Sequence, residues 1–253
     1  MGKTIAIANQ KGGVAKTTTA VNLGAWLSLM GQKVLLVDID PQGNATTGVG
    51  VDKNSLQCCI YDLLINGMNV RDVIVSSAVE NLDLIPATIE LAGAEVELVN
   101  VAGRESVLKN ALAEIRDEYD YIFIDCPPSL GLLTINALTA ADSVIIPIQC
   151  EYYALEGLSQ LMNTIRMVQE RLNKKLSLEG VLLTMFDGRT NLAIQVVDEV
   201  KKYFKEKVYK TIVPRNVRIS EAPSHGKPVM VYDRRSRGAE AYRELAEEVM
   251  GVG

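Results

Sequence analysis

Histidine and paired cysteines are scarce in this sequence, and their scarcity excludes several kinds of chemistry. His225 is the only histidine, so a serine or cysteine hydrolase of the histidine-dependent kind would have to use it as the base, and we do not expect that class. The four cysteines form no C-x-x-C pair, and Cys58 and Cys59 are adjacent, which favours neither a zinc site nor a disulfide framework. Such cysteines are typical of a protein in a reducing cytoplasm.

Long apolar runs and low-complexity segments are also missing. No apolar run approaches the roughly 18 residues of a spanning helix, and the first residues become glycine-rich too early for a signal peptide, so we expect neither. No linker or internal repeat interrupts the chain. With 253 residues, 48% hydrophobic and 23% charged, the composition is that of a globular protein, and we expect a single domain over residues 1–253.

The charge is unevenly distributed along the chain. The net charge is -5, yet residues 171–218 contain 11 Lys and Arg against 5 Asp and Glu. An acidic protein can therefore present one basic face, and the net charge alone does not argue against a nucleic-acid partner.

Short runs rich in Val, Ile and Leu alternate with helical patterns. This alternation predicts an α/β fold, a mostly parallel twisted sheet flanked by helices. The expected strands are 4–8, 33–38, 82–86, 121–125, 143–148 and 180–185, and the expected helices are 16–30, 104–118, 155–172, 192–204 and 238–250.

A glycine-rich turn between the first strand and the first helix is the clearest chemical signal. Residues 9–18 read Asn-Gln-Lys-Gly-Gly-Val-Ala-Lys-Thr-Thr. In such a turn backbone N–H groups point at an anion, a lysine neutralises phosphate oxygens and a hydroxyl can bind magnesium. The strict G-x-x-x-x-G-K-[ST] pattern fails at both glycines, where Gln10 and Ala15 stand. A turn that serves only strand-to-helix packing is the alternative.

The pattern Lys11-Gly-Gly-Val-x-Lys16-Thr-Thr resembles the deviant Walker A loop of the ParA/MinD ATPases, which an extra lysine marks. Residues 34–44 are similar to the second acidic motif of that family, and residues 121–129 to its Walker B motif. The resemblance continues through 151–158 and 214–228 to the last helix and so covers essentially the whole chain. It implies a P-loop NTPase fold, ATP hydrolysis, and ATP with Mg²⁺ as cofactors.

The resemblance adds a second nucleotide-binding segment. Pro214 and Asn216 match the loop that holds adenine in this family; a proline fixes such a loop, and an asparagine offers both a donor and an acceptor to a base edge. An ordinary turn before a short helix is the alternative. The candidate nucleotide-binding residues are Lys11, Gly12, Gly13, Val14, Ala15, Lys16, Thr17, Thr18, Pro214 and Asn216.

Hydroxyl and acidic side chains near the loop are candidates for metal binding and catalysis. We expect Lys16 near the β- and γ-phosphates, and Thr17 on the magnesium ion, which Asp125 binds through water. The family position of Asp40 orients the attacking water, which makes Asp40 catalytic, whereas Asp38 could help to hold the magnesium shell. Simple loop capping is the alternative for both of these aspartates.

Lys11 is the residue for which the resemblance implies a partner subunit. It implies that Lys11 reaches across a homodimer to the partner's nucleotide, so that charge compensation at the transferring phosphoryl group needs two subunits. Lys11, Lys16 and Asp40 are therefore the candidate catalytic residues, and ATP both joins the dimer and serves as its substrate.

Two arginines lie where relatives within this family contact nonspecific double-stranded DNA. These are Arg189 and Arg218, and the same basic block contains Lys201, Lys202, Lys205 and Lys207. Clustered cations from two subunits suffice for backbone binding without base readout. For the four lysines an ordinary solvated helix face is the alternative.

These features favour a DNA-binding ATPase that partitions chromosomes or plasmids with a ParB-type partner, in the cytoplasm on the nucleoid and without a membrane. A MinD-like division-site regulator is disfavoured because the last segment is acidic rather than a basic amphipathic helix. An iron–sulfur reductase is disfavoured because Cys126 and Cys150 lie in no cluster motif.

A P-loop module that binds nucleotide but hydrolyses it poorly is the remaining alternative, and Ala15 supports it. The family has glycine immediately before the P-loop lysine. If φ at Ala15 is positive, its methyl group adds strain of about 1 kcal/mol or more. We then expect nucleotide binding to survive while dimer closure or hydrolysis is impaired relative to Ala15→Gly.

Overall fold

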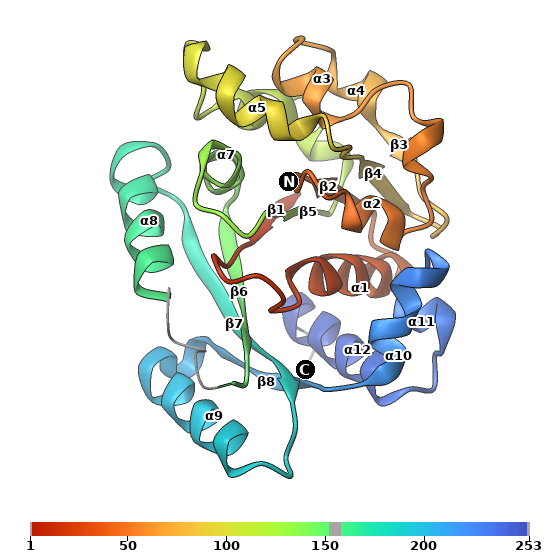
Figure 1. Cartoon of the computed structure of the whole chain (residues 1–253), viewed down its shortest axis with the longest axis vertical. Coiled ribbons are helices and arrows are strands. Elements are labelled where there is room, and N and C mark those ends of the chain that lie inside the picture. Colours follow the sequence, from red (N-terminus) through yellow and green to blue (C-terminus); the bar gives the residue numbers. More distant parts are fainter. Residues whose placement is uncertain (1, 152–157, 252–253) are drawn as a thin grey trace.

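Eight strands form one sheet in the computed structural model, which describes residues 2–151 and 158–251. Their order is β3-β4-β2-β5-β1-β6-β7-β8, and every neighbouring pair is parallel except β3 with β4 (Figure 1). The strands are β1 Lys3–Ile7, β2 Val34–Asp38, β3 Val75–Ser76, β4 Leu82–Ile85, β5 Tyr121–Asp125, β6 Ser143–Gln149, β7 Ser177–Phe186 and β8 Val208–Pro214.

Helices connect the strands and cover both faces of the sheet (Figure 1). The α-helices are α1 Lys16–Leu29, α2 Asn44–Gly48, α3 Ile60–Leu64, α4 Val70–Val73, α5 Leu91–Glu97, α6 Val107–Ala113, α7 Leu132–Ala140, α8 Leu158–Arg171, α9 Asn191–Phe204, α10 Val217–Glu221, α11 Val229–Tyr232 and α12 Arg237–Met250. Short 3-10 turns are η1 Lys53–Ser55, η2 Leu98–Asn100, η3 Arg116–Glu118, η4 Lys205–Lys207 and η5 Ala222–His225.

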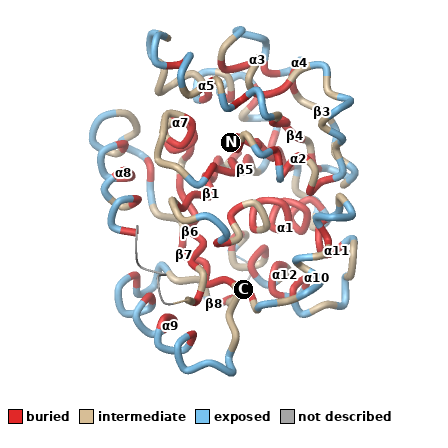
Figure 2. Tube along the Cα trace, in the orientation of Figure 1, coloured by how far each residue is buried: buried red, intermediate tan, exposed pale blue. Residues whose placement is uncertain are grey.

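The core consists of two apolar layers, one on each face of the sheet. On β1, Ile5 and Ile7 pack into the layer that contains α1 and α12, whereas Ala6 packs into the layer formed with α3 to α9. Successive side chains of a strand point to opposite faces, so a strand buried on both faces must be apolar throughout. Figure 2 shows the buried residues along the strands and on α1 and α12.

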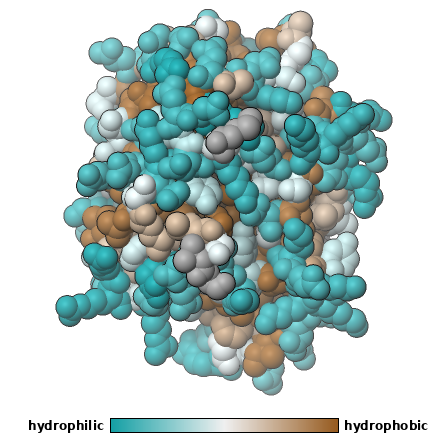
Figure 3. All heavy atoms as spheres, turned by 180° about the vertical axis from the view of Figure 1, so that it is seen from behind, coloured by the Kyte–Doolittle hydropathy of each residue, from teal (hydrophilic) through white to brown (hydrophobic). Residues whose placement is uncertain are grey.

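Hydrophilic residues dominate the face seen from behind in Figure 3, where hydrophobic residues form small separate groups. No described helix is long and apolar enough to cross a lipid bilayer.

The predicted fold class is confirmed, and six strands lie where the sequence pattern indicated. The short β3 and the edge strand β8 were not predicted; β8 is only partly buried and contains the exposed Lys210, so its apolar run is interrupted. The helix expected over 104–118 was too long, because α6 ends at Ala113 and the 3-10 turn η3 lets Arg116 donate to the Gly2 carbonyl and pair with Asp142. The helix expected from residue 155 begins in a segment outside the described residues.

Candidate functional site

The glycine-rich turn leaves β1 at the centre of the sheet and is fixed by the neighbouring strands. The Asn9 carboxamide accepts from the Lys11 N–H at 3.0 Å and donates to the Pro147 carbonyl at 2.7 Å. From β7, the Thr184 hydroxyl donates to the Val14 carbonyl at 3.1 Å. These three hydrogen bonds hold the turn in one shape, and electrostatic stabilisation of a phosphate requires such a preorganised turn.

Two residues of the turn have left-handed backbone conformations. Gly13 has φ 72°, and Ala15 has φ 69° and ψ 33°. Ala15 begins α1, and its carbonyl accepts from the backbone N–H of Thr19 at 2.9 Å and from the hydroxyl of Thr19 at 2.7 Å. Since φ is positive, the methyl group of Ala15 adds strain of about 1–2 kcal/mol at the place where the sequence pattern departs from the family.

Lys16 closes the turn on itself. Its side chain is buried, and the ammonium donates to the Lys11 carbonyl at 3.1 Å. Burial lowers the pKa of Lys16, and the nearby Asp125 is the strongest opposing influence. The ammonium thus lies near the carboxylates of Asp125 and Asp40 at the base of the turn, in a position to pair with a bound phosphate.

Asp38 and Asp125 occupy facing positions at the ends of the neighbouring strands β2 and β5. Asp38 accepts from the backbone N–H and the hydroxyl of Thr46, both at 2.8 Å, and from the Asp40 N–H at 3.2 Å. Burial raises the pKa of Asp38 to about 6 although these hydrogen bonds oppose the shift. Asp38 therefore shapes the turn that carries Asp40, and its role in the magnesium shell stays a prediction.

Asp125 is completely buried, and neither of its carboxylate oxygens has a hydrogen-bond partner among the described residues. Burial, followed by the charge of Asp38, raises the pKa of Asp125 well above its ordinary value. The Thr17 hydroxyl lies near enough to lower this pKa without making a hydrogen bond within 3.5 Å. A buried carboxylate without a partner, close to a hydroxyl, is a donor set that suits Mg²⁺.

A cavity of about 320 Å³ opens over this cluster. Asp40 lies at its wall, 7% exposed, and one carboxylate oxygen accepts from the Gln42 N–H at 2.9 Å. The predicted phosphate-binding residues Gly12, Gly13, Ala15, Lys16, Thr17 and Thr18 line the same cavity. The structure thus brings together the loop residues and the aspartate that the sequence assigned to catalysis.

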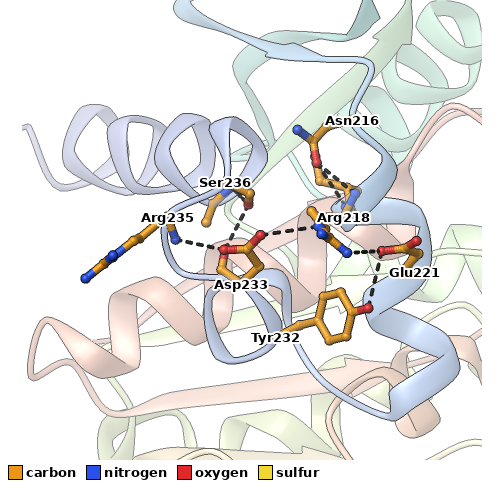
Figure 4. Close-up of polar contacts among 9 residues, drawn as sticks. Asn216, Arg218, Glu221, Tyr232, Asp233, Arg235 and Ser236 are labelled. Carbon is orange, nitrogen blue, oxygen red and sulfur yellow. Dashed lines mark hydrogen bonds and ion pairs between the residues drawn. The ribbon is translucent and has the colours of Figure 1, made fainter.

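A second cavity, of about 350 Å³, contains both residues assigned to adenine. Pro214 and Asn216 line it together with the apolar side chains of Ile219 and Tyr242. Figure 4 shows that the Asn216 side-chain oxygen caps α10, accepting from the N–H groups of Arg218 at 2.9 Å and Ile219 at 3.4 Å. The Asn216 oxygen is therefore already used. Of the donor and acceptor that we expected Asn216 to offer the base, only the NH₂ donor remains.

The two cavities share Ala15, Thr18 and Met185. Sequence reasoning missed Met185 and Thr184, because a methionine and a threonine near the end of a buried strand resemble ordinary core residues. Their only signal is spatial, since β7 approaches the turn from a position about 170 residues later in the chain. Thr46, which fixes Asp38 from eight residues later in the chain, was also missed, because it lies just beyond the acidic motif of residues 34–44.

The two arginines assigned to DNA are exposed but already paired. Arg189, with 87% of its side chain exposed, makes two hydrogen bonds to the Asp187 carboxylate at 2.6 and 2.8 Å. Arg218 is 51% exposed and pairs with Glu221 at 2.9 Å and Asp233 at 3.3 Å (Figure 4). Lys201, Lys202, Lys205 and Lys207 are exposed and make no ion pair within the described part of the chain.

A glycine-rich strand-to-helix turn, a buried lysine at its end, and a buried aspartate on the neighbouring strand define a P-loop ATPase. Comparisons with known proteins agree with this class. Residues 2–178 match the family model described as an AAA domain.

The chain is 68% identical to the sporulation initiation inhibitor protein Soj of Bacillus subtilis (strain 168) over 253 residues, which is all of both chains. It is 54% identical to the chromosome-partitioning ATPase Soj of Treponema pallidum (strain Nichols) over 250 residues, 99% of this chain and 98% of the relative. The chain belongs to the ParA/MinD family of ATPases.

Solved structures similar to this one include a complex with a nucleotide and magnesium. Cobyrinic acid a,c-diamide synthase from Mycobacterium smegmatis with bound ADP and magnesium superposes with a TM-score of 0.87 at 42% identity, covering 99% of this chain and 94% of that one. The cell division ATPase MinD of Pyrococcus furiosus gives a TM-score of 0.80 at 26% identity, with 100% of both chains covered. The protein is an ATPase of the chromosome-partitioning class, with ATP and magnesium as its cofactors.

Proposed function

We propose that this ATPase partitions chromosomes or plasmids as an ATP-bound homodimer that binds double-stranded DNA without sequence preference. A ParB-type partner stimulates its turnover, and the dimer acts in the cytoplasm on the nucleoid. The names of the relatives, which include a chromosome partitioning protein ParA of Myxococcus xanthus 56% identical over 250 residues, support this proposal.

Lys11 supports a dimer that ATP joins. Lys16 already occupies the base of its own turn, whereas the Lys11 ammonium makes no hydrogen bond or ion pair among the residues that the structure describes. A partly exposed cation beside the phosphate cavity can therefore extend to a phosphate held by a second subunit. Two subunits then stabilise the charge that develops during phosphoryl transfer.

Asp40 supports the hydrolytic step. One of its oxygens is held by the Gln42 N–H, which fixes the orientation of the carboxylate at the cavity wall. The other oxygen can accept a hydrogen bond from the attacking water. When bound, magnesium neutralises charge on the phosphates, and Thr17 and Asp125 are the residues that would hold it.

The observation that carries the DNA proposal is the group of exposed cations at the two ends of α9. It comprises Lys201 and Lys202 on the helix, Lys205 and Lys207 on η4, and Arg189 in the loop before α9. A sequence-independent complex needs clustered cations and not base contacts.

Two alternatives receive less support. A MinD-like membrane helix is disfavoured because the apolar side chains of α12, including Tyr242 and Leu245, are buried against the sheet layer and cannot face lipid at the same time. The second alternative, a P-loop module that binds nucleotide but hydrolyses it poorly, is favoured only by the strained backbone of Ala15.

The DNA proposal is tested by titrating a labelled random-sequence duplex with protein and ATP over a range of salt concentrations. We expect no binding without ATP, and affinity that falls steeply with salt. Arg189→Ala should lower the slope of log affinity against log salt by about 1.8 per dimer, since each phosphate contact contributes about 0.9. Arg71→Ala removes an exposed, paired arginine elsewhere and is the matched control.

Asp187→Asn is the complementary variant. If the Asp187 carboxylate competes with DNA phosphate for Arg189, removing its charge tightens DNA binding. Tight binding by the nucleotide-free protein, preference for one duplex, or an Arg189→Ala slope equal to that of Arg71→Ala would contradict the proposal. Stimulation of turnover is tested by adding the cognate ParB-type protein with DNA present.

A further inference from the structure

Met185 has a backbone conformation that is unusual for its position. Its φ is 51°, and among the described residues it is the only non-glycine with positive φ inside a strand, one residue before the end of β7. Side chains disfavour this region, and such conformations persist where the surroundings impose them and often where a site requires them.

The two neighbours of Met185 are both tied to the nucleotide site. Thr184 donates to the Val14 carbonyl of the glycine-rich turn at 3.1 Å, and the Phe186 carbonyl accepts from the Arg215 N–H of the adenine loop at 3.0 Å. The pairing of β7 with β8 changes register between Leu183 and Phe186. Met185 is thus held between the two segments that bind the two ends of a nucleotide.

The side chain of Met185 lies at the junction of the two cavities. Three residues line both, and the other two, Ala15 and Thr18, belong to the turn and the start of α1. Met185 is the only one of the three with a long apolar side chain, and it is partly exposed. Pro214 and Ile219 line the adenine cavity with it, so a flat aromatic ring there would meet apolar groups. A thioether contacts aromatic rings favourably.

We propose that Met185 is a nucleotide-positioning residue, whose side chain packs on the purine at the junction of the base and phosphate cavities. The strained backbone directs the side chain to that junction, and the contact sets the base relative to the triphosphate. This inference rests on the assignment of the cavity at Pro214 and Asn216 to adenine.

The test is calorimetric titration of the full-length protein with Mg·ADP and, separately, with Mg·tripolyphosphate, which has no base. The variants are Met185→Leu, which keeps apolar bulk, Met185→Ala, which keeps the strain, and Met185→Gly, which removes both. Met167→Ala on α8 is the matched control, because Met167 is exposed away from the cavities.

We expect Met185→Ala and Met185→Gly to weaken Mg·ADP binding about three- to tenfold, the range of a lost thioether–aromatic contact. Met185→Leu and Met167→Ala should stay within about twofold, and tripolyphosphate affinity should be unchanged throughout. The nucleotide-free Met185→Gly protein should melt at or above the temperature of Met185→Ala, because glycine adopts positive φ freely.

Unchanged ADP affinity in Met185→Gly, or an equal loss of tripolyphosphate affinity, would overturn the proposal. Ile219→Ala separates this failure from a wrong location of the base. If Ile219→Ala weakens ADP binding and the Met185 variants do not, the cavity holds adenine and only the role of Met185 is wrong. If neither weakens it, adenine binds elsewhere.

Discussion

Replacing Ala15 by glycine should stabilise the protein, although glycine loses more backbone entropy on folding than alanine does. Ala15 has φ 69° and ψ 33°, the left-handed conformation that costs a residue with a Cβ about 1–2 kcal/mol. Glycine relieves that cost but loses about 0.5–1 kcal/mol more backbone entropy on folding. Taken at the centre of both ranges, the difference is a net stabilisation of roughly 0.75 kcal/mol.

For a chain of this length, such a gain corresponds to a melting temperature about 1–4 °C higher. Differential scanning calorimetry of the nucleotide-free protein measures it directly. ATP turnover and ATP-dependent dimerisation, measured on the same samples, show whether the strain also limits closure or hydrolysis, in which case Ala15→Gly raises both.

Two substitutions serve as controls, and both should change the melting temperature in the direction opposite to Ala15→Gly. Gly13→Ala introduces the same strain in the same turn, where φ is 72° and an added Cβ would contact nothing within 4 Å, so it should lower the melting temperature. Ala92→Gly, at an exposed position within α5, should also lower it by the ordinary helix preference. An Ala15→Gly protein less stable than the parent would refute the strain argument, and unchanged turnover and dimerisation would make Ala15 neutral for function.

Four further substitutions test the catalytic cluster. Asp40→Ala should keep ATP affinity and slow hydrolysis at least tenfold, because the phosphate cavity survives while the water loses its acceptor; turnover within twofold of the parent removes Asp40 from catalysis. Lys16→Ala should weaken nucleotide binding in a titration, whereas Lys11→Ala should chiefly impair dimerisation or turnover, and equal losses of affinity would contradict a role across the interface. Asp125→Asn should abolish magnesium-dependent hydrolysis yet raise the unfolding free energy at pH 7, because burial and the charge of Asp38 raise the pKa of Asp125 on folding. The folded parent binds more protons than the unfolded chain, so its stability falls as pH rises from about 4 through about 6. Denaturation curves should therefore show the stability advantage of Asp125→Asn shrinking toward about pH 4. An advantage that is the same at every pH would exclude this linkage.

Local pattern predicted the central strands and the long helices, because both depend on residues close in sequence. Residues 121–125 form β5 as expected, since a strand buried on both faces must be apolar throughout. The helix expected over 104–118 was too long at both ends. It begins at Val107, and at its other end the tertiary contacts of Arg116 replace the last turn. The sequence pattern did not predict the edge strand β8, because partial exposure breaks its apolar run.

The residues of the glycine-rich turn were predictable because neighbours in sequence provide them. The partners that fix the turn were not: Thr184 and Met185 reach it from β7, and no pattern in the sequence records that approach. Asn216, which the sequence assigned to adenine, lines the second cavity, but its oxygen caps α10, and only the folded geometry shows this.

The central position of β1 has a consequence during synthesis of the chain. Lys3–Ile7 emerges from the ribosome well before its partners in the sheet, which are β5, beginning at Tyr121, and β6, beginning at Ser143. At about 5–20 residues per second, this apolar segment waits roughly 6–24 s for its first neighbour. Over that interval the strand that leads into the glycine-rich turn has no partner, so a nascent chain arrested before β5 should neither bind nucleotide nor resist proteolysis. The unpaired edges of β1 are then open to pairing with another chain.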